Sequence, residues 1–402
     1  MVRRVAVLSL HTSPLAQPGT GDGGGMNVYV RSFADALARA GVECDLLTRG
    51  DGSGSDVVEV GPGVRVVHLP VDPGGPVAKD ALLDLHDDLV DAAERWLTTD
   101  GGADVLHAHY WVSGAVAHTL KHRLGLPLVT TFHTLARAKQ DVGILDDPAH
   151  RFEVEAAIAR CSDGLIVSTG EERDLLVGAY GADGSRIEVI PPGVDHTVFA
   201  PGDVATARAR LGLGDGPLMV FVGRIQPLKG LDVAVHALAE LGRDDARLVV
   251  VGGPSGPDGE AELRSVQDLV ARLGLTERVT FVAPQAHDRL ADWYRAADVV
   301  LVPSRTESFG LVALEAGACG TPVVAAAVGG LQTVVEHGVS GFLVDERDPA
   351  AYAAAVAAVL ADDGGLRQRA ALRAQRFTWD LAAARLRRCY LDLPARELVR
   401  CT

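Results

Sequence analysis

Two glutamates eight positions apart, Glu307 and Glu315, are the residues of the chain best suited to bind a ligand. Glu307 lies in a loop of small residues, and Glu315 lies on an apolar stretch that predicts a helix beginning near Phe309. At about 3.6 residues per turn, Glu315 is expected about two turns into this helix. A carboxylate among apolar residues needs a polar partner, and the two adjacent hydroxyls of a ribose can supply one. We therefore expect Glu315 to bind a ribose.

The start of the predicted helix adds a second ligand-binding feature. The first backbone N–H groups of a helix have no partner within it, so those of Phe309, Gly310 and Leu311 are suited to a diphosphate. The spacing of the two glutamates alone favours an ordinary helix with one solvated carboxylate. Within the whole segment from Arg305 to Gly330, the combination instead favours a nucleotide-sugar site.

Two basic residues, Arg224 and Lys229, lie five positions apart directly after the predicted strand Leu218–Val222. Cations at the carboxyl end of a strand can bind a diphosphate from one side. The alternative is a solvated loop with two ordinary basic residues. The sequence has no Asp-x-Asp pair, by which many nucleotide-sugar enzymes hold a divalent cation on the diphosphate. We therefore expect Arg224, Lys229 and helix N-termini to neutralise the diphosphate, with no metal and no cofactor needed.

A glycine-rich loop, residues 19–27, follows the first predicted strand and opens a helix. Its glycines allow the backbone to approach an anionic group at the positive end of that helix. Gly19, Gly21 and Gly24 fit the spacing of a dinucleotide-binding fingerprint, but the second strand ends at Arg49, where an NAD site requires an acidic residue. NAD binding is therefore disfavoured.

Histidines and cysteines are the remaining candidates for chemistry. His133 ends the predicted strand Leu128–Phe132, where it can hydrogen-bond a sugar hydroxyl or a carbonyl, although a single histidine is more often structural. His107 and His109 have no third ligand at a suitable spacing, so packing is the better interpretation for them. The five cysteines have no metal-ligand spacing either and predict buried thiols of a reducing compartment. They are Cys44, Cys161, Cys319, Cys389 and Cys401.

The composition excludes several classes of protein. With 402 residues, 48% of them hydrophobic, the chain is long enough for two folded domains. A net charge of −15 argues against nucleic acid or an anionic membrane as the main partner. No apolar run approaches the roughly 20 residues of a membrane span, and the N-terminus predicts a strand rather than a signal peptide. A cytoplasmic protein is expected.

Alternating strand and helix patterns predict an α/β fold of two doubly wound, Rossmann-like domains that face each other across a cleft. The first domain is predicted over residues 1–195 and the second over 196–376, with a C-terminal helix in 377–402 that packs back on the first. Predicted strands of the first domain are Val5–Leu10, Cys44–Thr48, Val64–Leu69, Val105–His107, Leu128–Phe132, Gly164–Ser168 and Ile187–Ile190. Those of the second are Leu218–Val222, Leu248–Val251, Val279–Val282, Val299–Val302, Val323–Ala325 and Gly341–Val344.

In combination, the Glu-x7-Glu segment and the Gly-Arg-Ile-Gln-Pro-Leu-Lys-Gly loop resemble the retaining glycosyltransferases of family 4, which have the GT-B fold. The resemblance covers nearly the whole chain. It implies a UDP-sugar donor bound by Arg224, Lys229, Glu315, the turn at Gly24 and Gly25, and the helix start at Phe309, Gly310 and Leu311. It also implies that Glu307 and His133 contact the donor sugar, so that His133, Arg224, Lys229 and Glu307 form the catalytic set.

The stretch from His11 to Tyr29 is similar to one branch of this family, which transfers N-acetylglucosamine to inositol 3-phosphate in mycothiol biosynthesis. That resemblance implies an acceptor site made by His11, Asn27, Lys79, Tyr110, Thr134 and Arg151, with Lys79 and Arg151 as the cations for the acceptor phosphate. It further implies small-molecule substrates and a possible homodimer.

Three alternatives stay open. Sucrose-phosphate synthases share much of the N-terminal stretch, and Thr131–Arg137 resembles that branch equally well, so fructose 6-phosphate is a second candidate acceptor. A UDP-sugar 2-epimerase has the same architecture but needs no acceptor cations. A binding protein without catalysis would not require the complete set of Arg224, Lys229, Glu307 and Glu315. The donor sugar, N-acetylglucosamine or glucose, is also left open.

Overall fold

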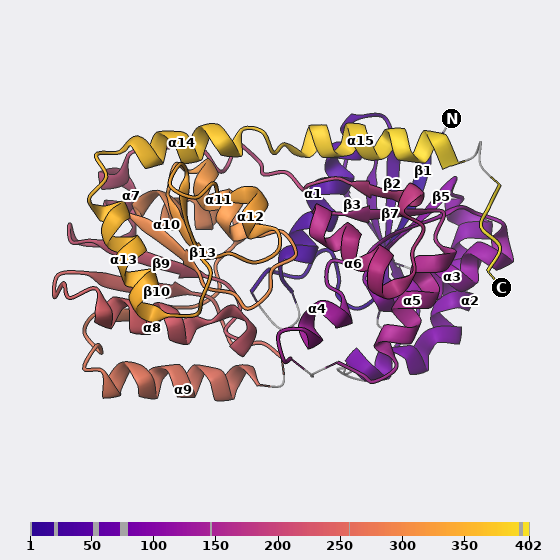
Figure 1. Ribbon diagram of the computed structural model, residues 1–402. Coiled ribbons are helices and arrows are strands. Elements are labelled where there is room, and N and C mark those ends of the chain that lie inside the picture. Colours follow the sequence, from indigo (N-terminus) through magenta and orange to yellow (C-terminus); the bar gives the residue numbers. More distant parts are fainter. Residues whose placement is uncertain are drawn as a thin grey trace. The chain divides into compact units, whose positions relative to one another are not determined.

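Two β-sheets covered by helices make up the computed structural model, which describes residues 2–19, 23–50, 56–72, 79–144, 147–256, 258–393 and 397–401 (Figure 1). The chain divides into two compact units. Unit 1 consists of Met1–Ala16, Met26–Pro192 and Trp379–Thr402, and unit 2 consists of Gln17–Gly25 and Gly193–Thr378. The chain therefore contributes an early segment to unit 2, completes that unit at Thr378 and then returns to unit 1.

The sheet of unit 1 has the strand order β3-β4-β2-β1-β5-β6-β7-β8, and all neighbours pair in parallel except β3 and β4. Its strands are β1 (Arg4–Leu8), β2 (Glu43–Arg49), β3 (Asp56–Gly61), β4 (Val64–Leu69), β5 (Val105–His109), β6 (Leu128–Thr131), β7 (Gly164–Val167) and β8 (Ile187–Val189). The α-helices are α1 (Gly25–Arg39), α2 (His86–Trp96), α3 (Trp111–Leu124), α4 (Ala136–Gln140), α5 (Arg151–Cys161), α6 (Gly170–Tyr180) and α15 (Trp379–Asp392). Shorter helical turns are η1 (Lys79–Leu85), η2 (Leu97–Gly101) and η3 (Gly184–Arg186).

The sheet of unit 2 is parallel throughout, with the order β11-β10-β9-β12-β13-β14. Its strands are β9 (Leu218–Val222), β10 (Arg247–Val251), β11 (Val279–Val282), β12 (Val299–Val302), β13 (Val323–Ala326) and β14 (Gly341–Val344). The helices are α7 (Val204–Leu211), α8 (Leu231–Glu240), α9 (Gly259–Arg272), α10 (Leu290–Ala296), α11 (Leu311–Ala318), α12 (Leu331–Val334), α13 (Pro349–Leu360) and α14 (Gly365–Ala374). The turns η4 (Pro227–Lys229) and η5 (His287–Arg289) precede α8 and α10.

Both faces of the central strands of each sheet are buried, which explains their high valine content. Successive residues of a strand point to opposite faces, so Leu218 and Val220 of β9 join one hydrophobic cluster while Met219 and Phe221 join another. In unit 1, α15 runs beside α1 over one face of the sheet, and residues of both helices share a cluster (Figure 1). In this way, every central strand is covered by helices on both sides.

The strand order reverses between β1 and β5 in unit 1 and between β9 and β12 in unit 2. In an open parallel sheet, ligands bind outside the carboxyl ends of the two strands at such a reversal. The loops that follow these four strands hold His11, Tyr110, Arg224 and Glu307. The topology therefore predicts that ligands bind near the residues that follow these strand ends.

The prediction of two doubly wound α/β units with parallel sheets is confirmed, but three details are corrected. The edge strand β3 was not predicted. The helix with Glu315 begins at Leu311, not near Phe309, so Glu315 is little more than one turn into it. Cys161 and Cys401 are not single thiols, because they are joined in a disulfide. Among the helices that the structure describes, none has the length and apolar character needed to span a membrane.

Candidate functional site

The loops after β9 and β12 of unit 2 are locked together by their backbones. A side chain at Gly230 would lie 2.2 Å from the carbonyl oxygen of Pro303, so only glycine fits there. Next to this contact, the N–H group of Arg305 donates to the carbonyl of Leu228 over 2.9 Å. These contacts bring Lys229 to Glu307, and Lys229 Nζ donates to Glu307 Oε2 over 2.7 Å. Two residues that the sequence placed in one site are therefore in direct contact.

A third loop, after β13, contacts the backbone of Glu307. The N–H group of Gly330 donates to the carbonyl of Glu307 over 2.9 Å. A Cβ atom on Gly330 would lie 2.1 Å from Cα of Phe309, so the two loops touch backbone to backbone. The side chains of Lys229 and Glu307 are 22% and 19% exposed, which leaves both within reach of a ligand.

Arg224 lies beside the glycine-rich loop, whose residues Gln17–Gly25 belong to unit 2. A Cβ atom on Gly24 would lie 3.3 Å from Arg224 Nε, and one on Gly25 would lie 3.4 Å from Leu311 Cδ1. The predicted donor residues Gly24, Gly25, Arg224 and Leu311 are thus neighbours. Gly21 of the same loop lies outside the described residues.

The partners of Glu315 are protein side chains that sequence reasoning missed. Glu315 is buried, its Oε1 accepts from His287 Nε2 over 2.7 Å, and its Oε2 accepts from the hydroxyl of Tyr294 over 2.9 Å. Neither residue is near Glu315 in the chain, and for that reason only a ribose was expected as the partner of Glu315. The role of Glu315 in ribose binding stays a prediction, and His287 joins it as a candidate, since its side chain is partly exposed.

Electrostatics favour a charged His287. Burial opposes the positive charge, but the charge of Glu315, its hydrogen bond, and the charges of Asp288 and Asp195 outweigh it and raise the pKa of His287. The pKa of Tyr294 is held well above its usual value by burial and by the charge of Glu315, so its hydroxyl stays a donor. Glu315 therefore has one partner, His287, whose positive charge it favours, and one neutral partner, Tyr294.

Among the described residues of unit 1, two that are not glycine have positive φ angles, and both were predicted site residues. Tyr110, directly after β5, has φ = 76°, and His133, after β6, has φ = 63°. Such conformations are strained and concentrate at functional sites. His109 Nδ1 lies 2.8 Å from His133 Nε2, which fixes the orientation of the His133 ring.

His107 and His133 are uncharged at neutral pH. Burial lowers the pKa of His133 to about 3, and burial together with the repulsion that a protonated His133 would exert lowers the pKa of His107 to about 3 as well. His107 is held in the core between the hydroxyls of Tyr390 and Thr131, at 2.6 and 2.9 Å. A neutral His133 can exchange hydrogen bonds with a sugar but does not supply a positive charge at neutral pH.

The predicted acceptor residues Tyr110, Thr134 and Arg151 are grouped together. The guanidinium of Arg151 lies over the ring of Tyr110, 5.0 Å from its centre, and donates to the carbonyl and hydroxyl of Thr134. It also donates to Glu155 Oε1 and to Asp147 Oδ1, each over 2.7 Å. Arg151 is fully buried and already has two carboxylate partners, which its prediction as a phosphate ligand did not include.

The same carboxylate binds a second cation that sequence reasoning missed. Lys139 Nζ lies 3.1 Å from Asp147 Oδ1, and these two side chains are 15% and 13% exposed. Asp147 therefore bridges two cations at the edge of this group. The side chain of Lys79, the other predicted phosphate ligand, lies outside the described residues.

His11 and Asn27 lie near the carboxyl end of β1. The ring of His11 lies 4.5 Å from that of Tyr110, centre to centre. Asn27, buried in the first turn of α1, donates from Nδ2 to the carbonyl of Ser13 over 2.6 Å and to Thr12 Oγ1 over 3.2 Å. His11 thus belongs to the Tyr110 group, whereas Asn27 holds the loop after β1.

The chain matches two descriptions of known families: "Glycosyl transferase 4-like domain" over residues 24–193 and "Glycosyl transferases group 1" over residues 203–377. It is 48% identical to the D-inositol 3-phosphate glycosyltransferase of Xylanimonas cellulosilytica, with 99% of this chain and 98% of the relative covered. It is 47% identical to the enzyme of the same name from Acidothermus cellulolyticus, with 94% and 88% covered.

Two solved structures share the fold. The sucrose-phosphate synthase of Thermosynechococcus elongatus is 36% identical and superposes with a TM-score of 0.90, with 98% of this chain and 99% of that chain covered. Anabaena HepE, solved with UDP and glucose, is 20% identical, with a TM-score of 0.77 and 97% and 100% covered, and therefore supports the fold alone.

We expect the contribution of His287 to stability to depend on pH. Because its pKa is raised in the folded state, the charged pair with Glu315 stabilises fully below the unfolded value of about 6.5 and is lost as the pH rises through the folded value. His287→Gln should therefore lower the melting temperature more at about pH 5.5 than at about pH 9. Tyr294→Phe removes the other, neutral contact and should cost the same at both. Equal losses for His287→Gln at the two pH values would contradict this assignment.

Proposed function

The chain belongs to the family 4 glycosyltransferases, and on that basis we propose that it transfers a glucose-type sugar from a UDP donor to a hydroxyl of inositol 3-phosphate, with retention of configuration. The observation that carries the proposal is the contact of Lys229 with Glu307 at the strand reversal between β9 and β12, next to the N-terminus of α11. The inositol 3-phosphate acceptor follows the curated relatives of 48% and 47% identity. The donor sugar is N-acetylglucosamine or glucose.

The reaction requires stabilisation of the departing diphosphate. As the bond from the anomeric carbon to the β-phosphate breaks, negative charge grows on the phosphate oxygens, and Arg224, Lys229 and the backbone N–H groups after Ser308 stabilise it. Among the residues proposed for the site, no side chain is suited to attack the anomeric carbon from the opposite face. The acceptor hydroxyl therefore attacks from the side of the leaving phosphate, and a phosphate oxygen takes its proton.

The pairing of Lys229 with Glu307 links the two halves of the donor. A diphosphate that binds Lys229 competes with Glu307 for its ammonium, which directs the Glu307 carboxylate toward the hydroxyls of the adjacent sugar. His133 can take part only as a neutral hydrogen-bonding group, because its low pKa excludes a role as a charged acid at neutral pH.

The acceptor phosphate is proposed to bind the cations that Asp147 now holds. Lys139 and Arg151 both contact Asp147 Oδ1, and Thr134 presents its hydroxyl to Arg151. A phosphate with two negative charges is a stronger partner for this pair than one carboxylate. In this arrangement Asp147 occupies the place of the phosphate until the acceptor arrives.

Fructose 6-phosphate is the second candidate acceptor. It is favoured by the fold of the sucrose-phosphate synthase at a TM-score of 0.90, and its phosphate could use the same cations. The identity is lower, at 36% against 48%, which is why inositol 3-phosphate is preferred. A 2-epimerase remains distinguishable because it releases UDP or a free sugar without any acceptor.

The first test is UDP release by the purified protein, with each UDP-sugar paired in turn with inositol 3-phosphate and with fructose 6-phosphate. We expect UDP release only with inositol 3-phosphate. The rate of UDP release should not fall when EDTA is added briefly. Release of UDP with fructose 6-phosphate alone would assign the chain to the sucrose-phosphate synthase branch of the family. Release without any acceptor would contradict a transferase.

Lys229→Ala should reduce turnover by on the order of 100-fold or more, because it removes a cation from the leaving group. Its melting temperature should change little, since ion pairs that solvent can reach contribute little to stability. Arg243→Ala is the matched control, because it breaks an exposed pair with Asp245 that has the same nitrogen–oxygen distance of 2.7 Å. Normal turnover in Lys229→Ala would refute the proposed leaving-group role.

Asp147→Asn should lower KM for inositol 3-phosphate by about fivefold or more, because the acceptor no longer displaces a charged carboxylate from Lys139 and Arg151. KM for the donor should stay the same. Asp141→Asn serves as the control, since Asp141 pairs with Arg137 on the exposed side of α4. An unchanged or raised acceptor KM in Asp147→Asn would show that these cations do not bind the phosphate.

A further inference from the structure

Four potential metal ligands gather in unit 1, away from the residues proposed for catalysis. They are His118 and His122 on α3, Cys161 at the end of α5 and Cys401 near the C-terminus, and their ligand atoms all lie within 4.8 Å of one another. His118 Nε2 and His122 Nε2 lie 3.2 and 3.1 Å from Cys401 Sγ, and Cys161 Sγ lies 3.5 Å from His122 Nε2. Sequence spacing did not reveal this group, because 240 positions separate the two cysteines.

Three of the four ligands are held in place by the packing of α3 against α5. A side chain at Gly114 of α3 would lie 2.9 Å from Ile158 Cδ1, so glycine permits the two helices to approach closely. Lys121, between the two histidines, donates to the carbonyl of Cys161 over 2.7 Å. Since residues four apart lie on one face of a helix, His118 and His122 are both directed toward the end of α5.

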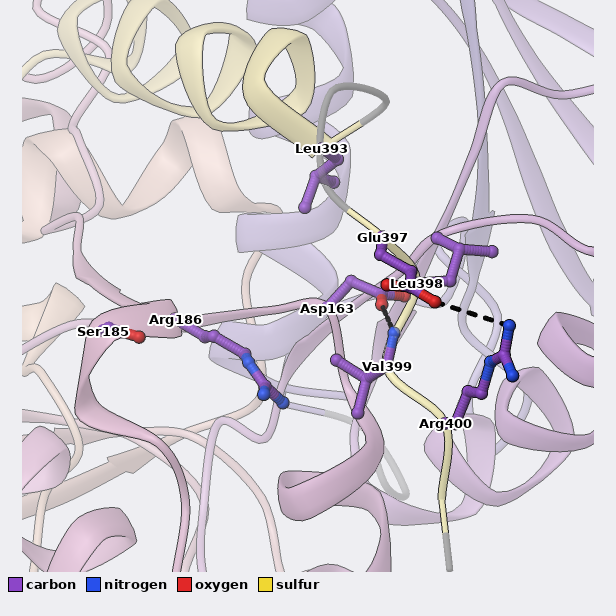
Figure 2. Close-up of a pocket in the computed structure, with 8 residues that line it drawn as sticks. All are labelled: Asp163, Ser185, Arg186, Leu393, Glu397, Leu398, Val399 and Arg400. Carbon is purple, nitrogen blue, oxygen red and sulfur yellow. Dashed lines mark hydrogen bonds and ion pairs between the residues drawn. The ribbon is translucent and has the colours of Figure 1, made fainter.

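The fourth ligand arrives on a segment that has no regular secondary structure. Residues 397–401 run along unit 1 as an extended chain, and Figure 2 shows Val399 donating its N–H to Asp163. The same carboxylate accepts from the N–H of Leu128 and pairs with Lys121, at 2.8 Å each. The segment leaves a cavity of about 560 Å³ beside Ser185 and Arg186, so it is not held there by close packing. Asp163 and the cluster at Cys401 are therefore its main attachments.

We propose that, in the reduced protein, His118, His122, Cys161 and Cys401 bind one zinc ion that fastens the C-terminal segment to α3 and α5. Two imidazole nitrogens and two thiolates are a common ligand set of structural zinc. Zn–N and Zn–S bonds of about 2.0 and 2.3 Å place tetrahedral ligands about 3.3 to 3.8 Å apart, close to the nitrogen–sulfur separations of 3.1 to 3.5 Å found here.

Charge and access also favour a metal. Two thiolates neutralise a divalent cation, and the nearby Lys121 is already paired with Asp163. His122 and Cys401 are exposed, which gives the ion a path from solvent. The disulfide between Cys161 and Cys401 does not by itself explain why both imidazoles converge on the Cys401 sulfur. The disulfide and the zinc site exclude each other, because a metal requires both sulfurs as thiolates.

The test is the metal content of the full-length protein, purified with a phosphine reductant and without chelators. We expect about one zinc per chain by mass spectrometry of the metal, and a thiolate-to-metal charge-transfer band after replacement by cobalt. His122→Ala and Cys401→Ser should weaken zinc binding by at least about 100-fold in competition with a chromophoric chelator. Cys389→Ser makes the same change outside the cluster and should bind zinc as the parent does.

Two results would overturn the proposal. One is that the Cys161–Cys401 disulfide is the only state of the protein, so that peptide mapping after thiols are alkylated at lysis finds it throughout and protein purified with the reductant holds no metal. The other is a reduced protein without metal whose Cys161 and Cys401 react with alkylating reagents as fast in the presence of zinc as in its absence. Circular dichroism of each variant separates loss of a ligand from loss of the fold.

Discussion

All strands of a parallel sheet end at one edge, and the loops that follow them have to share it. In unit 2 this constraint is met by direct backbone contact, since Gly230 lies against the carbonyl of Pro303 and Gly330 against Phe309. Lys229 and Glu307, 78 positions apart, come within 2.7 Å of each other as a consequence. The N-terminus of α11 belongs to the same loop. The proposed chemistry of unit 2 therefore depends on close packing that leaves no room for side chains at these glycines.

Arg151 in unit 1 and Lys229 in unit 2 are held in ion pairs, for an energetic reason. A buried guanidinium such as that of Arg151 is costly without carboxylate partners, and Asp147 and Glu155 provide them. Lys229 has Glu307 in the same way. A phosphate that binds at either place exchanges with a carboxylate instead of meeting a bare cation. The free energy of binding is then the difference between the free energy of the cation–phosphate pair and that of the cation–carboxylate pair it replaces. Such an exchange favours selectivity for highly charged ligands more than it favours high affinity.

Local patterns were sufficient to predict the fold class and most strands, because buried parallel strands are short apolar runs between turns. The edge strand β3 was not predicted, since its valines stand beside acidic residues and none of the residues in Asp56–Gly61 is buried. Lys229 and Glu307 could be found because each lies in a recognisable loop. His287, Tyr294, Lys139 and Asp147 could not, because their proximity to predicted residues is created by tertiary packing. The same holds for Cys161 and Cys401, whose pairing no spacing rule reveals.

The return of the chain to unit 1 has a consequence for synthesis on the ribosome. Helix α15 supplies Trp379, Leu386 and Tyr390 to the core of unit 1, and Tyr390 hydrogen-bonds His107. Unit 2, in contrast, draws on no residue after Thr378. During translation, unit 2 can close its core while the sheet of unit 1 still lacks one covering helix. The segment translated first is therefore completed last, and its open face is exposed to chaperones for as long as unit 2 is being made.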